Sequence, residues 1–260
     1  MHIATFNING IRARLPALLD WLRESAPDVV VLQELKSVDA GVPRDEIESL
    51  GYTVETHGQK GFNGVAILSK PPLEDIVRGL PGDEADEQAR WIEATVAGDS
   101  GVVRICGLYA PNGNPAPGPK YAYKLDWMAR MEARARDLLA EEIPVVLAGD
   151  YNVIPEARDA ANPQAWIGDA LFLPDTRAAW RRIVHLGFHD ATREVDQGSG
   201  TYTFWDYQRG AWNRDDGIRI DHALLSPEAA DRLRGAGVDR AVRGGEKPSD
   251  HVPVWVEVAV

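Results

Sequence analysis

Two short segments of the chain carry the residue types that phosphoester chemistry needs. Asp150 and Asn152 follow an apolar run at 143–149, and Asp250 and His251 stand just before another apolar run near the end of the sequence. A continuous apolar run predicts a buried strand, so these polar side chains are expected where a strand ends and solvent begins. An acid, an amide and a histidine in one place can hold a metal ion and direct water at a phosphate. The two segments therefore predict metal-assisted phosphate chemistry.

Three further apolar runs also end in polar residues. Asn7 follows the run at 2–6, Glu34 follows a run of valine and leucine, and Asn112 lies just beyond a third. Strand ends are where α/β proteins place their sites. An asparagine there can simply form a turn, but glutamate is neither a favoured turn former nor a comfortable neighbour of a buried run. Together with Asp150, these strand ends indicate one shared site.

Strand-like and helix-like segments alternate along the chain, which is typical of an α/β protein. The apolar pattern predicts helices at 15–23 and 121–139, and the second carries a leucine and methionine stripe whose spacing indicates core packing. With no repeat and no linker-like stretch, one domain over residues 1–260 is the preferred interpretation. The strand polarity indicates a mixed sheet, or two stacked sheets with helices outside. Strands are predicted at 2–6, 28–32, 64–68, 91–96, 102–109, 143–148, 219–225 and 252–258.

The overall charge is unfavourable for binding a polyanion. The chain has 28 Lys and Arg against 40 Asp and Glu, a formal net charge of -12, whereas nucleic-acid binders are usually basic. Part of the acidic excess lies in a loop-like stretch at 82–87, and part consists of candidate metal ligands whose charge a cation would offset. A DNA-binding rim must therefore be local. Its candidates, each of which could instead be a solubilising surface charge, are Lys36, Lys60, Arg90, Lys120, Arg214 and Lys247.

The remaining composition sets broad limits. With 44% apolar residues, a chain of 260 residues can bury a large core. Its start lacks the features of a signal peptide, and no apolar run is long enough to cross a membrane. The single cysteine, Cys106, excludes an intrachain disulfide and is expected to be a small buried hydrophobe. A cytoplasmic protein that acts as a monomer without membrane association is expected.

Nine short motifs, in order along the chain, resemble the exonuclease III family of the endonuclease/exonuclease/phosphatase superfamily. The resemblance implies a four-layered α/β sandwich of two mixed β-sheets flanked by helices, with the site at one edge. It also implies a DNA-repair enzyme for double-stranded DNA with abasic (AP) sites or blocked 3′ ends, acting as AP endonuclease, 3′-to-5′ exonuclease and 3′-phosphatase or phosphodiesterase. The motifs are NINGIR from residue 7, LQELK from 32, HGQKG from 57, NGVAILS from 63, YAPNG from 109, GDYN from 149, YTFWDY from 202, RID from 219 and SDH from 249.

The resemblance implies a divalent metal ion held by oxygen ligands. Glu34 is implied as the principal ligand of Mg²⁺, or of Mn²⁺, with Asn7 beside it and Asp250 in a second position. Carboxylate and amide oxygens suit such hard cations. Leu35 stands where many relatives have threonine, and Asn9 stands where the eukaryotic abasic endonucleases have an acid, so the number of metal ions stays open.

The resemblance also divides the reaction among side chains. Asp150 is implied to activate or orient the attacking water, and Asn152 to help hold the nucleophile and the phosphate. His251 is implied to contact the scissile phosphate while Asp221 orients its ring, a general device for fixing a histidine tautomer. Tyr109 belongs to the same catalytic group. Taken alone, the pair of His251 and Asp221 could be purely structural.

Contacts to DNA are implied for two further groups of residues. Phosphate or DNA contacts are implied for Tyr109, Asn112, Lys36 and Arg90. Phe204, Trp205 and Ile220 match an apolar pocket for an extrahelical sugar without its base, which is easier to extrude than an intact nucleotide. Trp205 could equally be a core aromatic on a strand.

Two other functions remain open at this point. A phosphatase or lipid phosphodiesterase of the same superfamily would share the metal and the histidine, but would lack the YTFWDY and YAPNG motifs, which favour DNA. A non-catalytic DNA-binding or scaffolding protein could keep the fold, but the unbroken set of catalytic residues favours an enzyme.

Overall fold

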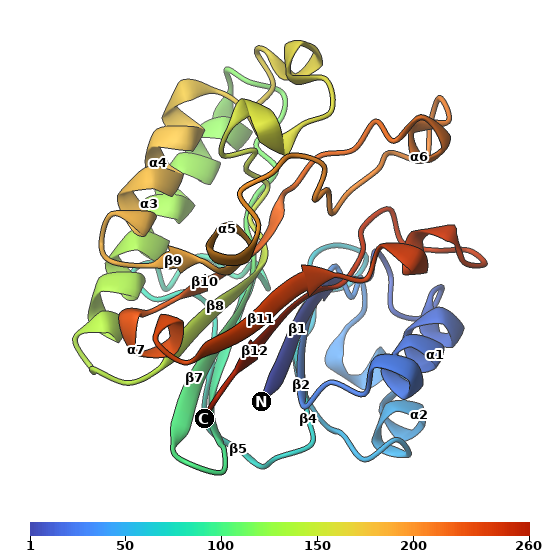
Figure 1. The fold of residues 1–260 in the computed structure, drawn as a ribbon, viewed down its shortest axis with the longest axis vertical. Helices are drawn as coiled ribbons and strands as arrows, with labels where there is room; N and C mark the ends of the chain where they lie inside the picture. Colours follow the sequence, from blue (N-terminus) through green and yellow to red (C-terminus); the bar gives the residue numbers. More distant parts are fainter.

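Two six-stranded mixed sheets stack face to face in the structure, a computed structural model that describes residues 1–260 (Figure 1). The first sheet has the strand order β11-β12-β1-β2-β4-β3, and the second has the order β5-β6-β7-β8-β10-β9. The strands are β1 His2–Asn7, β2 Val29–Gln33, β3 Thr53–His57, β4 Val65–Ser69, β5 Leu73–Arg78, β6 Trp91–Ala97, β7 Val102–Tyr109, β8 Val145–Asp150, β9 His189–Asp190, β10 Asp221–Leu225, β11 Leu233–Val238 and β12 Val254–Val258.

Helices cover the outer face of each sheet. Those on the first sheet are α1 (Leu15–Ser25) and α2 (Arg44–Glu48), and those on the second are α3 (Pro119–Leu139) and α4 (Pro174–Val184), which lie on opposite sides in Figure 1. None of the helices combines the length and the apolar character needed to cross a bilayer. The short helices are α5 Ala191–Val195, α6 Ala211–Arg214 and α7 Pro227–Ala230.

Apolar side chains fill the space between the two sheets. Ile3 and Val31 from the first sheet share one buried cluster with Ile105 and Val146 from the second. The sheets lie close together at Gly107 of β7, where a Cβ would lie 2.9 Å from Cγ1 of Val31, so a larger residue would require Val31 to shift. Separate clusters lie under the outer helices. The predicted four-layered α/β sandwich is confirmed.

The strand directions bring the ends of six strands to one edge. β1 pairs in parallel with β2, and β7 pairs in parallel with β8. β12 runs antiparallel to β1, and β10 runs antiparallel to β8. The carboxyl ends of β1, β2, β7 and β8 therefore meet the amino ends of β10 and β12 at the same edge.

Candidate active site

Strand ends deliver the candidate residues to this edge. Asn7 is the last residue of β1, and Asp150 is the last residue of β8. Asp221 opens β10 and pairs with Asp150 in the antiparallel register, so the two carboxylates are neighbours across the sheet. Glu34 follows β2 directly, and His251 stands just before β12. Local strand pattern and sheet direction together bring these residues to one place.

Three of these side chains form a compact cluster that could hold a metal ion. Ligand atoms of Glu34, Asp150 and His251 all lie within 4.8 Å of one another. Asn7 ties the two carboxylates together, because its Nδ2 donates to Oε1 of Glu34 at 3.0 Å and to Oδ2 of Asp150 at 2.9 Å. The hydroxyl of Tyr109 donates to the same Oε1 at 2.9 Å. Glu34 has φ +54°, a left-handed conformation that costs a non-glycine residue about 1–2 kcal/mol and is often found at functional sites.

A buried line of charges runs from Asp221 through His251 to Asp150. Nδ1 of His251 lies 2.8 Å from Oδ2 of Asp221, and its Nε2 lies 3.8 Å from Oδ2 of Asp150. Burial alone would lower the pKa of His251, but the surrounding carboxylates, Asp221 first, raise it well above its usual range. Burial raises the pKa of Asp150, and the charge of Asp221 raises it further. The raised pKa of His251 favours the protonated form of its ring, and the raised pKa of Asp150 makes this carboxylate a better proton acceptor.

Glu34 is kept ionised by its neighbours. Burial would raise the pKa of Glu34, but hydrogen bonds from Lys36 and Asn7 and the charge of Lys36 lower it overall. Nζ of Lys36 lies 2.8 Å from Oε2 of Glu34 and donates to Oδ1 of Asn9 at 2.5 Å. Asn9 donates to Oδ1 of Asp250 at 2.9 Å. Asp250, predicted to hold metal in a second position, is thus engaged by Asn9 and lies outside the cluster of three.

The donor set fits a hard divalent cation. Carboxylate oxygens, as on Glu34 and Asp150, are the ligands that Mg²⁺ prefers. The ring of His251 belongs to the cluster by distance, but a protonated imidazole has no free lone pair to offer a metal. Asn7, predicted as a ligand beside Glu34, directs its Nδ2 at the carboxylates, and its oxygen accepts from the backbone N–H of Asn9 at 3.1 Å. Metal binding therefore depends chiefly on the carboxylates.

Two neighbouring loops add amide and cationic groups to the site. Nδ2 of Asn112 donates to Oδ1 of Asn152 at 3.2 Å, and Asn152 donates to the carbonyl of Ala110 at 2.9 Å. The guanidinium of Arg90 lies 4.8 Å from the ring centroid of Tyr109 and also donates to its carbonyl. Tyr109 and both asparagines line the same cavity as the carboxylate cluster. These groups provide the neutral and charged donors that a phosphate needs.

The cavity over the cluster has a volume of about 240 Å³ and one apolar wall. That wall contains Phe204 and Ile220, both predicted for the sugar pocket, together with Trp166 and Leu171. Phe204 packs edge-on against His251 with ring centroids 5.0 Å apart. The sequence offers no motif or periodic pattern that identifies Trp166, which ends a short 3₁₀ helix (Pro163–Trp166), or Leu171, which lies in the loop that follows.

Trp205 does not reach this cavity, contrary to its predicted place in the pocket. Its side chain is fully buried, and its Nε1 donates to Oδ1 of Asp215 at 3.0 Å. The ring packs edge-on against Trp212 at 4.9 Å and lies under the guanidinium of Arg240 at 5.1 Å. Trp205 is therefore a core aromatic, which was the alternative interpretation of the sequence.

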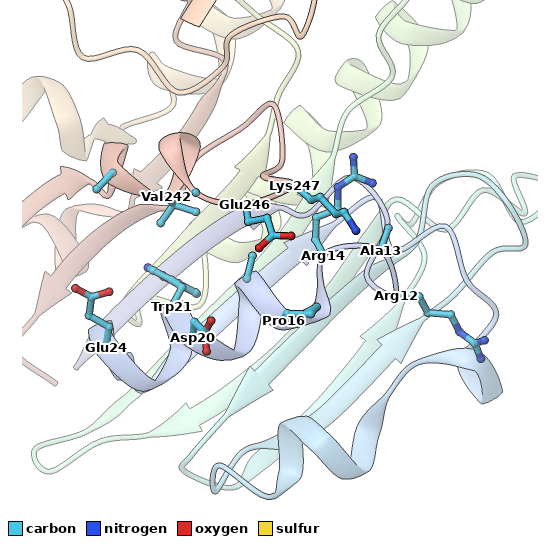
Figure 2. Close-up of a pocket in the computed structure, with 13 residues that line it drawn as sticks. Arg12, Ala13, Arg14, Pro16, Asp20, Trp21, Glu24, Val242, Glu246 and Lys247 are labelled. Carbon is cyan, nitrogen blue, oxygen red and sulfur yellow. The ribbon is translucent and has the colours of Figure 1, made fainter.

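A larger cavity of about 580 Å³ lies beside the site, between α1 and the 3₁₀ helix η4 (Arg240–Gly244) with the residues that follow it. Figure 2 shows Arg14 and Lys247 toward one end of this cavity and Glu24 toward the other. Arg14 links it to the site, because its Nη1 donates to the carbonyl of Asn9 at 2.8 Å. No histidine lines this larger cavity, and none of its residues belongs to the possible metal-binding cluster. The smaller cavity is therefore the candidate active site.

Stacked sheets whose shared edge holds a buried acid–histidine cluster are typical of a phosphoester hydrolase. The chain belongs to the Endonuclease/Exonuclease/phosphatase family, whose sequence model matches residues 4–251. The resemblance carried by the nine motifs is thereby confirmed.

Individual relatives cover nearly the whole chain. The protein is 35% identical to exodeoxyribonuclease III of Haemophilus influenzae, over 99% of each chain, and 31% identical to the DNA repair nuclease APEX1 of Danio rerio, over 100% of this chain and 83% of the other. Among solved structures, an AP endonuclease from Archaeoglobus fulgidus superposes with a TM-score of 0.94 at 37% identity. A variant of the 3′ phosphatase NExo from Neisseria, bound to a product DNA hairpin, superposes with a TM-score of 0.96 at 36% identity. Both superpositions cover 100% of each chain.

Proposed function

We propose that this protein is a divalent-metal-dependent DNA-repair phosphodiesterase that acts on double-stranded DNA. It cleaves beside abasic sites, removes nucleotides from 3′ ends and clears 3′ phosphates or other 3′ blocking groups. The observation that carries the proposal is the cluster of Glu34, Asp150 and His251 in a small cavity that combines polar amides with one apolar wall. The names of the relatives, which include exonucleases, AP endonucleases and a 3′ phosphatase with DNA bound, support this class of substrate.

The proposed reaction divides hydrolysis among a few side chains. Glu34, with the Asp150 carboxylate beside it, would hold Mg²⁺ or Mn²⁺, and the ion would supply neutralisation of the phosphate charge and activation of water. Asp150 orients the attacking water and accepts its proton, a role supported by its raised pKa. His251 presents its protonated Nε2 to a phosphate oxygen while Asp221 holds Nδ1. Asn152 directs its amide at the phosphate and the nucleophile.

The substrate is selected beside this machinery. Phe204 and Ile220 form the wall against which a sugar without a base packs, and such a sugar costs less to extrude than an intact nucleotide. Lys36 and Arg90 provide positive charges beside Glu34 and Tyr109, and Tyr109 and Asn112 add polar contacts to the phosphate. Away from the cluster, the rim continues along the cavity of Figure 2 through Arg14 and Lys247.

The assembly and location follow from this proposal. One chain contains every member of the cluster, which supports action as a monomer. The two sheets share one buried core, which supports a single domain. A bacterial exodeoxyribonuclease III is among the relatives, and its substrate class, DNA, supports residence in the cytoplasm.

Cleavage of a defined duplex tests the proposal. A duplex that carries one tetrahydrofuran abasic analogue and a 5′ label should be nicked by the purified protein with Mg²⁺, and EDTA should stop the reaction. Asp150→Asn should lower the rate by at least about 1,000-fold, because it removes the proton acceptor and one carboxylate from the metal site. Asp137→Asn, an exposed change on α3, is the matched control and should leave the rate unchanged.

The same experiment distinguishes the activities. A recessed intact 3′ end measures exonuclease action, and a 3′-phosphate end measures phosphatase action. No cleavage of any of the three duplexes by the wild-type protein, or undiminished cleavage by Asp150→Asn, would contradict the proposed mechanism.

A further inference from the structure

Lys124 is a buried cation outside the set of residues that the proposed reaction uses. It lies on α3, and its side chain is fully enclosed by protein. Its Nζ donates to the carbonyl of Pro111 at 2.8 Å and to the carbonyl of Asn152 at 2.6 Å. Burial lowers the pKa of Lys124 to about 7, although the charges of Asp150 and Asp169 raise it. A lysine that is held only by carbonyls is costly to bury, so a neutral residue there would be expected to stabilise the fold better.

The two carbonyls belong to the loops that carry the phosphate-contacting amides. Pro111 immediately precedes Asn112 in the loop after β7, and Asn152 lies in the turn after β8. Neither carbonyl accepts a hydrogen bond from any other group of the protein. Lys124 is therefore the one side chain that joins these two carbonyls, and it does so from beneath the site.

The surrounding backbone is shaped to this lysine. Gly113 has φ +89°, and a Cβ at this position would lie 2.6 Å from Cδ of Lys124. The loop can close over the lysine stem only because residue 113 is glycine. Asn152 has φ +49°, so the turn that Lys124 holds is in a left-handed conformation that few residues adopt. The amides of Asn112 and Asn152 meet directly above, at 3.2 Å.

We propose that Lys124 is a positioning residue of this active site. Its ammonium fastens the loop after β7 to the turn after β8, and so sets the spacing of the Asn112 and Asn152 amides that receive the phosphate. The inference rests on the proposed function, because it takes the phosphate as the ligand of these two amides. It adds a residue of α3 that lies outside all nine motifs to the parts that determine the rate.

Lys124→Met tests this role, since methionine fills similar space but leaves both carbonyls without a donor. Single-turnover and steady-state cleavage of the abasic duplex with Mg²⁺ should show kcat lowered about 10- to 100-fold, because displacements near 1 Å have effects of this size. KM should change less than about three-fold, since the DNA-binding rim is untouched. Arg136→Met, which removes an exposed cation from the same helix, should behave as the wild type.

A double-mutant cycle separates positioning from general stability. If Lys124 acts through Asn112, the loss caused by Lys124→Met should be at least about three-fold smaller in an Asn112→Ala background. The same substitution should remain fully additive with Ile220→Ala, which alters the apolar wall instead. Full additivity with Asn112→Ala, or an unchanged kcat, would overturn the proposal.

Folding is checked by circular dichroism and thermal unfolding of each variant. Lys124→Gln, which keeps one amide donor, replaces Lys124→Met if the latter does not fold, and should lie between the wild type and the expected loss. Failure of both variants to fold would assign Lys124 to folding and overturn the proposal. An inactive wild-type protein would instead refute the proposed function, which the same assays show separately.

Discussion

Asp221→Asn removes the charge that holds His251 and leaves the shape of the site almost unchanged. The two side chains are buried and meet at 2.8 Å. A hydrogen bond to a charged group contributes about 1.5–3 kcal/mol net, and each 1.36 kcal/mol corresponds to a factor of ten in rate. If this contact is retained in full in the transition state, the variant should lose about 10- to 150-fold in kcat.

The pH dependence of this loss identifies its cause. In the wild type, the raised pKa of His251 keeps the ring protonated as the pH rises past neutrality, and the proton is lost only above that raised value. Without Asp221, burial dominates and lowers the pKa, so the variant should keep the proton only in acid. The deficit should therefore be largest near pH 8 and shrink toward about pH 6.

Single-turnover cleavage of the abasic duplex at saturating Mg²⁺ measures both effects. Asp137→Asn removes an exposed carboxylate far along α3 and should follow the wild-type profile at every pH. A rate within about three-fold of the wild type would show that Asp221 does not act through the imidazole. A deficit that is equal at all pH values would instead assign the loss to altered geometry rather than to the charge on the ring.

Three further changes probe the pocket and the core. Phe204→Ala widens the apolar wall and should reduce the preference for an abasic over an intact nucleotide about 10-fold or more, measured with matched duplexes; an unchanged ratio would remove Phe204 from selection. Trp205→Phe should lower the free energy of unfolding by about 1–3 kcal/mol in urea titrations and leave cleavage unchanged, while lost activity in a stable variant would contradict its core role. Burial lowers the pKa of His222 to about 3, whereas the same imidazole in the unfolded chain takes up a proton below about pH 6.5. The free energy of unfolding should therefore fall by roughly 1.4 kcal/mol per pH unit as the pH is lowered from about 6 to 4. His222→Asn should make this slope less steep. Equal slopes for the two proteins would contradict that assignment.

The strand ends could be predicted from the sequence because they depend on local pattern. Apolar runs followed by Asn7, Glu34 or Asp150 indicate buried strands that end in polar groups, and parallel strands share an edge. The contacts between these residues could not be predicted in the same way. The bridge from Asn7 to both carboxylates requires the second sheet to stack on the first, so that β1 faces β8. Lys124 carries no local signal, since a lysine on a helix is normally exposed.

Edge strands and a helix with a narrow apolar stripe could not be predicted with the same patterns. β11 (Leu233–Val238) contains two glycines, which weaken a strand signal, and it forms because β12 offers a free edge. α4 (Pro174–Val184) buries one narrow stripe of side chains, and most of its other positions are polar, so its apolar pattern is weak. The long α3 was predictable because its apolar stripe recurs over five turns, and its start at Pro119 lies two residues before the predicted one. Trp205 was recognised in the sequence but could not be placed, because an aromatic residue in an irregular segment can line a pocket or belong to the core.

The acidic character of the chain is compatible with DNA binding because charge acts locally in salt solution. At physiological ionic strength the screening length is about 8 Å, so only cations beside the phosphates count. Some of the carboxylates are neutralised locally by arginines away from the site, as with Asp86 beside Arg130 and the buried Glu93 between Arg104 and Arg134.

The salt dependence of DNA binding measures how many cations the rim contributes. Each neutralised phosphate changes the slope of log K against log salt by about 0.9, so a rim of Lys36, Arg90, Arg14 and Lys247 predicts a slope between about −3 and −4. Lys247→Met should flatten this slope by about 1 in fluorescence anisotropy titrations with a catalytically inactive background. A slope that Lys247→Met does not change would exclude the cavity of Figure 2 from the path of the DNA. The DNA would then have to pass over the other side of the cluster, where Lys36 and Arg90 already contact Glu34 and Tyr109.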